Sequence, residues 1–156
     1  AGMDLALALV EDDLGPQAAL AIARQLVLFV RRPGGQAQFS TGLAAQSAER
    51  DALRELQEWM PGQLGDDLSV PALAARAHMS TRHFSRAFHQ EIGCTPAAYV
   101  ERLRVEHGRL LLESTSIPVE AIAATCGFAN PETMRRAFAR RVGASPAAYR
   151  SRFAAA

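Results

Sequence analysis

Residues 84–99 read Phe84-Ser85-Arg86-Ala87-Phe88-His89-Gln90-Glu91-Ile92-Gly93-Cys94-Thr95-Pro96-Ala97-Ala98-Tyr99. Fifty positions later the chain reads Met134-Arg135-Arg136-Ala137-Phe138-Ala139-Arg140-Arg141-Val142-Gly143-Ala144-Ser145-Pro146-Ala147-Ala148-Tyr149. Arg, Ala, Phe and Gly recur in register, as does the closing Pro-Ala-Ala-Tyr, and Ile/Val and Thr/Ser are close exchanges. This recurrence predicts two copies of one supersecondary unit.

Each copy is predicted to fold as two short helices joined by a tight turn. In the first copy, Ser69 can cap a helix that ends at about Ala77, and Ser80 can cap a second helix over 81–92. Apolar side chains in both helices recur at the spacing of an inward-facing helix stripe. A helix, a short turn and a second helix in this order form the helix-turn-helix pattern.

The second copy has the same order of elements and one more residue in its turn. We expect helices over about 118–126 and over 131–141, the second capped by Asn130 and opened by Pro131. The register shows the extra residue: Leu73 pairs with Ile122, 49 positions on, whereas Phe84 pairs with Met134, 50 positions on.

The turns also differ in residue type, because Gly127 of the second turn corresponds to His78 of the first. Glycine adopts a positive φ freely, whereas histidine is only one of the residues enriched there. We therefore expect slight strain in the first turn, within a unit that still folds.

The segment between the copies, residues 96–113, is predicted to form one long helix with apolar residues among charged ones. Its eighteen residues would span roughly 27 Å at ~1.5 Å per residue. Successive major grooves on one face of DNA lie ~34 Å apart. With the width of each unit added, one chain could place both second helices in adjacent grooves. It would then read a long, non-palindromic site without dimerising.

Upstream of the repeats we expect further helices. Two apolar helices are predicted over 3–12 and 17–31, and a third runs from about Ser47 until Pro61 ends it. Residues 36–48 are polar, small and typical of a linker. No segment alternates with the period of a β-strand. The predicted fold class is all-α, with two tandem helix-turn-helix units joined by a long helix and preceded by two to three extra helices.

The composition excludes several classes of protein. No apolar run among the 156 residues reaches the ~18 to 20 that a membrane-spanning helix needs. The start carries no basic segment of a secretory signal and no initiator methionine, so we expect a fragment of a longer protein. Cys126 stands where the first copy has Ala77, which predicts a small buried residue rather than a disulfide or a metal ligand.

Charge is distributed unevenly along the chain. Residues 1–65 carry five Arg against eight acidic residues, and residues 66–156 carry twelve Arg against eight, within a net charge of +1. All 17 basic residues are arginine, the side chain suited to bidentate contacts with phosphate and guanine. A basic excess of this size does not by itself establish nucleic-acid binding, because ordinary solvated helices can look similar.

The second helix of each copy carries arginine opposite its apolar stripe. In the first copy Phe84 and Phe88 face inward, and the outward side chains are Arg82, Arg86 and His89, with Ser85 and Gln90 beside them. In the second copy Met134 and Phe138 face inward, and the outward side chains are Glu132, Arg136 and Ala139, with Arg135 and Arg140 beside them. One such face alone is most simply a solvated surface. Two such faces, with arginine at the same position in each copy, indicate instead that these helices bind in the major groove of DNA and recognise its bases.

Residues 66–153 resemble the DNA-binding domain of the AraC/XylS family of bacterial transcription regulators. The resemblance rests on Ile122-Ala123, Cys126-Gly127-Phe128, Phe138, Gly143 and Ser145-Pro146-Ala147-Ala148-Tyr149. It implies base contacts from Arg82, Ser85 and Arg86 in the first helix-turn-helix copy, which we call unit one. In the second copy, unit two, it implies base contacts from Pro131, Glu132, Arg135 and Arg136. Pro131 departs from an often polar position, and without a donor it offers apolar contact or only a helix start.

Phosphate contacts are expected beside these base contacts. His89 on the outward helix face is one candidate, and Arg140 flanks the second reading face. Thr95 and Ser145 are predicted helix caps, and the N–H groups at those helix starts can also face phosphates.

The first forty residues carry a weaker resemblance. The stretch that begins with residues 1–7 and ends with residues 31–36 looks like the end of a PfpI-like, amidotransferase-like domain. In the GlxA-type subfamily, such a domain precedes the AraC-type module. The implied organisation is a remnant of that domain with a linker over 1–40 and the DNA-binding domain over 47–154. The latter divides into unit one (66–95), the linker helix (96–113) and unit two (117–153). Effector sensing and any dimerisation would belong to the absent upstream part.

The sequence therefore predicts a non-enzymatic, cytoplasmic regulator, associated with the nucleoid when bound to DNA. Its partner is double-stranded DNA, RNA polymerase is a further candidate partner, and no cofactor, metal or membrane is expected. His83, His89, His107 and Cys94 lack the spacing of a metal or catalytic set. Two alternatives stay open: a fragment of an amidotransferase-like hydrolase, and a helical interaction module whose apolar residues 5–30 bind a partner.

Overall fold

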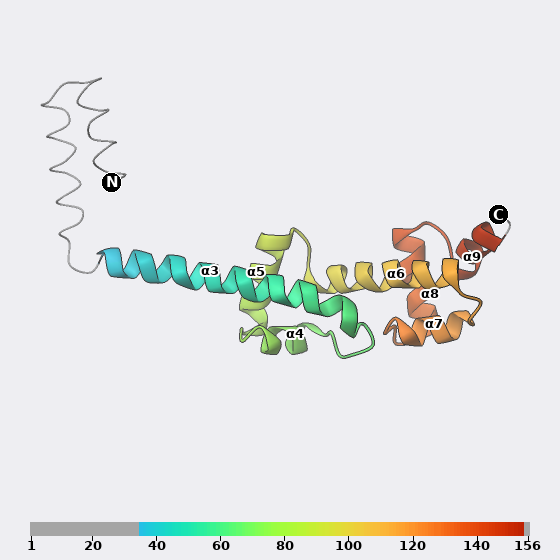
Figure 1. Cartoon of the computed structure of the whole chain (residues 1–156), viewed down its shortest axis with the longest axis horizontal. Coiled ribbons are helices and arrows are strands. Elements are labelled where there is room, and N and C mark those ends of the chain that lie inside the picture. The colour runs from blue at the N-terminus through green and yellow to red at the C-terminus, as the bar shows by residue number, and fades with distance from the viewer. Residues whose placement is uncertain (1–34, 155–156) are drawn as a thin grey trace, which may run out of the picture. The chain divides into compact units, whose positions relative to one another are not determined.

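The computed structural model describes residues 35–154, with side chains from residue 40 onward. Every regular element in this range is a helix, which confirms the all-α fold class for the described residues (Figure 1). The elements are α3 (Gly35–Trp59), the 3-10 helix η1 (Met60–Gln63), α4 (Val70–Arg76), α5 (Thr81–Ile92), α6 (Pro96–Ser114), α7 (Val119–Thr125), α8 (Pro131–Arg141) and α9 (Pro146–Ala154). The helices predicted over 3–12 and 17–31 lie outside the described residues.

The chain divides between residues 47 and 48, and both sequence repeats lie within the one compact part that begins at residue 48. Among the described residues, no helix is long and apolar enough to cross a membrane.

The segment predicted as a linker, residues 36–48, is helical and forms the first half of helix α3. It contains no proline and is rich in alanine and glutamine, which are strong helix formers. Residues 40–48 are exposed, so tertiary packing does not explain their helicity. The segment continues into the part of α3 where Leu53 and Leu56 are buried, and extending an existing helix costs less than starting a new one.

Side-chain caps mark the starts of α4, α5 and α8, as predicted. The hydroxyl of Ser69 accepts from the backbone N–H of Ala72 at 3.4 Å, and that of Ser80 accepts from His83 N–H at 3.2 Å. In the second copy, Asn130 Oδ1 accepts from Thr133 N–H at 2.8 Å. Each cap satisfies a donor that the first helical turn leaves without a partner.

The two helix-turn-helix turns differ by one residue, as the repeat register predicts. The first runs from the α4 C-cap at Ala77 to Ser80, and the second from the α7 C-cap at Cys126 to Asn130. His78 has φ 56° and is the one non-glycine residue with positive φ among residues 35–154, whereas its counterpart Gly127 has φ 83°. Both turns therefore adopt the left-handed conformation at this position, and in the first turn a residue with a Cβ atom has to adopt it.

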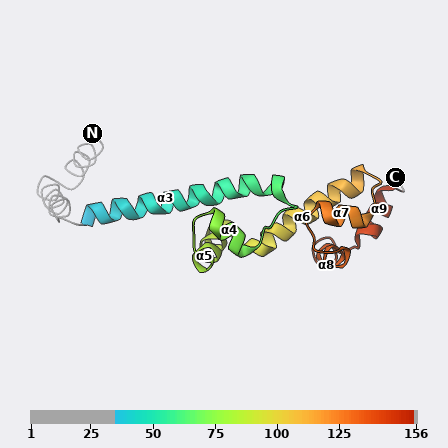
Figure 2. The same ribbon diagram turned by 90° about the horizontal axis from the view of Figure 1, so that it is seen from below.

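Two hydrophobic cores share the long helix α6. Phe84 and Phe88 of α5 are fully buried in the first core, and Met134 and Phe138 of α8 are fully buried in the second. Helix α6 adds Tyr99 and Val100 to the first core and Val105 and Leu112 to the second. It passes from one helix-turn-helix unit to the other in both views (Figure 1, Figure 2).

Helix α8 packs closely on α6 at Gly108. A Cβ atom built there would lie 3.2 Å from Met134 Cε and from two ring atoms of Phe138. Glycine at this point lets the two helices approach, so the second core is assembled directly on the shared helix.

We predict that Gly127→Ala destabilises the fold far more than Gly93→Ala. Both glycines have positive φ, 83° and 85°, so alanine at either should cost about 1–2 kcal/mol. A Cβ at Gly127 would also lie 1.7 Å from the carbonyl oxygen of Leu64, whereas nothing lies within 4 Å at Gly93. Overpacking should raise the total loss for Gly127→Ala to about 3–5 kcal/mol. Urea denaturation of both variants checks this, and equal losses would contradict the close approach to Leu64.

Candidate nucleic-acid interface

Helix α5 presents an exposed face with two arginines. Arg82, Arg86 and His89 are exposed and Ser85 is partly exposed, while Phe84 and Phe88 hold the opposite face in the core. The predicted inward and outward faces of this helix are therefore confirmed. Arg82 makes no hydrogen bond or ion pair with any residue that the structure describes.

Arg86 is positioned by a chain of polar contacts that the sequence did not reveal. Its Nη2 donates to His83 Nδ1 at 3.3 Å, and His83 Nε2 lies 2.7 Å from Glu49 Oε1 on α3. With Nδ1 as the acceptor, the ring proton lies on Nε2 and is donated to Glu49. A histidine to which the sequence assigned no role thus links α3 to the outward arginine of α5.

Helix α8 presents the corresponding face in unit two. Pro131, Glu132, Arg135 and Arg136 are exposed, and Met134 and Phe138 are buried. Pro131 is the first residue of the helix, where its missing N–H leaves no hydrogen bond unmade.

Glu132 and Arg135 form a bidentate ion pair on this face. Arg135 Nε donates to Glu132 Oε2 at 2.8 Å, and Arg135 Nη2 donates to Glu132 Oε1 at 2.6 Å. Arg136 Nε lies 3.8 Å from the same carboxylate. The hydrogen bond from Arg135 is the main cause that lowers the pKa of Glu132, against a smaller opposing effect of desolvation. Unit two therefore offers a partly neutralised face.

Arg140 is bound to the shared helix. Its Nη2 donates to Glu101 Oε2 on α6 at 2.7 Å, and Arg141 Nε donates to Glu101 Oε1 at 2.9 Å. The Arg140 hydrogen bond is the largest cause that lowers the pKa of Glu101; Arg141 adds to it, and burial opposes it. A phosphate at Arg140 would have to compete with this carboxylate.

The predicted phosphate positions at helix starts act as caps. Thr95 Oγ1 accepts from Ala98 N–H at 3.2 Å at the start of α6, and Ser145 Oγ accepts from Ala148 N–H at 3.1 Å at the start of α9. Both hydroxyls are thus used within their own helices, which leaves other N–H groups of the first turn for an anion.

Nothing in the described part of the chain forms a metal centre. No group of three or more His, Cys, Asp or Glu side chains converges among those residues. Cys94 and Cys126 are free thiols, and Cys126 is fully buried, as predicted. Burial raises the pKa of the Cys126 thiol to about 11, so it is protonated at neutral pH.

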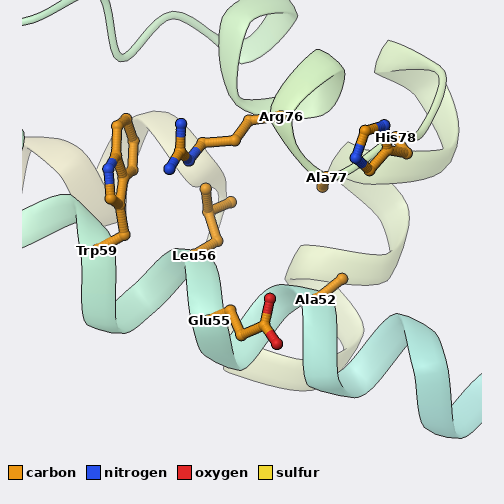
Figure 3. A pocket seen from close by; sticks show the side chains of 7 residues that line it. All are labelled: Ala52, Glu55, Leu56, Trp59, Arg76, Ala77 and His78. Atoms are coloured by element: carbon orange, nitrogen blue, oxygen red, sulfur yellow. The ribbon is translucent and has the colours of Figure 1, made fainter.

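A surface hollow lies between α3 and the end of α4 (Figure 3). Its lining residues are Ala52, Glu55, Leu56, Trp59, Arg76, Ala77 and His78. Arg76 points toward Trp59, with its guanidinium carbon 3.7 Å from the ring centroid, so a cation–π contact already engages the one arginine of the lining. No lining residue comes from α5 or α8, so the hollow is separate from the two arginine-bearing faces.

The side chains missed by sequence reasoning all act across long sequence distances. Glu49 is 34 residues from His83, and Glu101 is about 40 residues from Arg140 and Arg141. No spacing rule connects such pairs. The proximity of His83 and Arg86, three positions apart on one helix, was the one available signal.

Two helix-turn-helix units that share a helix and each expose an arginine-bearing second helix define a protein of the helix-turn-helix class. The family described as "Helix-turn-helix domain" matches residues 73–152, more than half of the chain. The chain belongs to this family, and its relatives identify the domain as the AraC type.

Transcription regulators are among the similar sequences. The chain is 54% identical over 93 residues to the HTH-type transcriptional regulator Rv1931c of Mycobacterium tuberculosis, covering 60% of this chain and 36% of that protein. It is 29% identical over 146 residues to the HTH-type transcriptional regulator CdhR of Pseudomonas aeruginosa, covering 94% of this chain and 44% of that protein. The chain therefore matches less than half the length of either relative.

Similar solved structures support the same assignment. The DNA-binding domain of AdpA, solved in complex with a target DNA, has a TM-score of 0.64 and 39% identity, covering 66% of this chain and 93% of that one. An AraC-type regulator from Chromobacterium violaceum has a TM-score of 0.60 and 27% identity, covering 69% of this chain and 96% of that one.

We predict that Glu132 titrates below the ordinary value of 4.5 and that Arg135→Gln raises its pKa. Because the pKa is lowered in the folded state, the ion pair stabilises the fold at pH values above the ordinary pKa. This stabilisation is lost as the pH falls through the folded-state pKa. An NMR titration of the Glu132 carboxylate in both proteins measures this, with Arg136→Gln as the control for the longer contact. The same titration curve for Glu132 in wild type and Arg135→Gln would contradict the pairing.

Proposed function

We propose that this chain binds double-stranded DNA sequence-specifically as the DNA-binding part of a transcription regulator. The observation that carries the proposal is the pair of exposed, arginine-bearing helices, α5 and α8, built onto the single helix α6. Helices of this size fit the major groove, and arginine can bind the O6 and N7 atoms of guanine in bidentate fashion.

We assign the reading of bases to solvent-accessible side chains in the N-terminal halves of the two helices. These are Arg82, Ser85 and Arg86 in α5 and Pro131, Glu132, Arg135 and Arg136 in α8. His89, Arg140 and the helix starts after Thr95 and Ser145 would contact phosphates. Because the two sets differ in charge and in hydrogen-bonding groups, the two units would read different half-sites of an asymmetric target.

The relatives support this proposal. Both named sequence relatives are HTH-type transcriptional regulators, and the similar AdpA domain is described in complex with its target DNA. A regulator of this kind acts by binding, and we propose no reaction for this chain. RNA polymerase would be a further partner, and the site of action would be the cytoplasm, at the nucleoid.

Residues 1–40 would be the end of a PfpI-like, amidotransferase-like domain, as in regulators of the GlxA type. The DNA-binding domain would cover residues 47–154. The match to CdhR supports a relationship beyond the helix-turn-helix units, because it extends over 94% of this chain, against 60% for Rv1931c. The upstream domain would then bind the effector and mediate any dimerisation.

We predict that Arg86→Ala and Arg136→Ala each weaken binding to the preferred site by about 1–3 kcal/mol and relax specificity at one base position. The site would first be selected by the wild-type chain from a random DNA pool. Binding by each variant to that site and to its single-base variants is then measured. Arg54→Ala is the matched control, because Arg54 is an exposed arginine of α3, paired with Asp51 and outside both reading faces. Wild-type affinity in both reading-face variants would refute the assignment.

We also predict a steep loss of affinity with salt, because arginine contacts to phosphates release counterions. If the two units together contact roughly six to ten phosphates, affinity should fall about 10³–10⁵-fold between 50 and 200 mM salt. Fluorescence anisotropy with the selected duplex across this range measures the slope. A flat dependence would show that binding does not involve the phosphate backbone.

A further inference from the structure

Two sets of contacts bring parts of the two helix-turn-helix units together around their shared helix. One contact joins the segment before α4 to α6 and to the turn of unit two. The other joins α6 to the end of α8. Nothing in the reading faces requires either contact, so their role lies in how the units are held relative to each other.

The first contact is made by Arg104 and Gly127. Arg104 of α6 donates from Nε to the Leu64 carbonyl at 3.3 Å and from Nη2 to the Asp66 carbonyl at 3.5 Å. Gly127, in the turn of unit two, lies so close to Leu64 that a Cβ would reach 1.7 Å from the same carbonyl oxygen. Thus the segment that leads into unit one lies against the turn of unit two, with Arg104 bonded to it.

The second contact centres on Glu101. Its carboxylate accepts from Arg140 at 2.7 Å and from Arg141 at 2.9 Å, and Arg141 Nη2 also donates to the Ala98 carbonyl at 2.7 Å. Glu101 and Arg141 are each less than one-third exposed, so this ion pair is better shielded from salt than a surface pair. It attaches the C-terminal end of recognition helix α8 to the half of α6 that belongs to the first core.

A helix alone leaves the units some freedom to bend and twist. One base pair changes the relation between two half-sites by about 3.4 Å and about 35°, so small motions would let the chain accept altered spacing. Contacts on α6 at Glu101 and Arg104, less than one turn apart, oppose both motions. Holding the helices in the bound arrangement beforehand also reduces the entropy lost on binding.

We propose that these contacts, which we call the inter-unit clamp (Glu101, Arg104, Gly127 and Arg141), determine the half-site spacing that the chain accepts. The inference rests on the proposed DNA-binding function. The clamp residues are positioning residues: they hold α5 and α8 in a defined relation, while the exposed faces read the bases.

The test uses the full 156-residue chain and DNA selected by the wild-type protein from a random pool. Binding is measured to the selected duplex, to duplexes with one base pair added or removed between the half-sites, and to each half-site alone. The variants are Glu101→Gln with Arg104→Gln, and Arg141→Gln as a milder change that leaves α6 intact. Glu106→Gln is the matched control, because Glu106 is also on α6 but pairs with Arg109 of the same helix.

We expect the wild type and the control to discriminate strongly against altered spacing. In the double variant the affinity ratio between selected and altered spacing should fall roughly tenfold, because the clamp no longer holds the two units in the one arrangement that fits the selected spacing. In Arg141→Gln the ratio should fall by a smaller factor. Binding to the isolated half-site of α5 should stay at the wild-type level. Binding to the half-site of α8 should not weaken, because the loss of the Glu101 carboxylate frees Arg140 for a phosphate. Circular dichroism and thermal unfolding would identify a variant that fails to fold, in which case Arg141→Gln decides.

The proposal is overturned if folded variants keep the wild-type spacing ratio, whether or not they bind more weakly overall. It is equally overturned if the half-site affinities fall as much as the affinity for the full site, because the residues would then act within one unit. A wild-type chain that selects no sequence at all would instead refute the proposed function itself.

Discussion

The structure depends on one helix that belongs to two cores. Within α6, Tyr99 and Val100 pack with α5, whereas Val105 and Leu112 pack with α8. Because both sets lie on a continuous helix, turning one unit about the α6 axis would pull apolar side chains out of its core, at about 25 cal/mol per Å² exposed. The hydrophobic effect therefore fixes where each second helix lies about its own part of α6. Bending and twisting between the two parts of α6 is left to the polar contacts at Glu101 and Arg104.

Local chemistry explains why much of this arrangement was predictable. The caps at Ser69, Ser80 and Asn130 are read directly from residue type, because a short polar side chain just before an apolar periodic run can bond the first free N–H groups. The repeat predicted the extra residue of the second turn and the buried pairs of α5 and α8. These features depend on neighbours within a few positions, so no knowledge of the tertiary structure was needed.

The features that the sequence did not predict depend on how the chain continues or folds beyond the immediate neighbours of a residue. Residues 36–48 looked like a linker because they are small and polar, yet alanine and glutamine sustain a helix once the packed half of α3 has started it. The sequence placed Arg140 beside the second reading face but gave no sign of its partner, Glu101, which is 39 positions away. His83 gave no sign of Glu49 for the same reason. In the candidate site, sequence reasoning predicted which side chains are outward, and it missed which of them are already paired.

That difference in pairing separates the two reading faces. Arg82 of α5 has no polar partner in the described part of the chain. In the proposed complex, a guanine or phosphate would therefore displace only water from its guanidinium. Arg135 of α8 already has two hydrogen bonds to Glu132, which a DNA contact must share or replace. The pair also holds the planar guanidinium in one orientation, which reduces the entropy lost on binding. Two copies of one scaffold can thus combine a strongly basic face with a more selective one, because only the exposed positions have diverged.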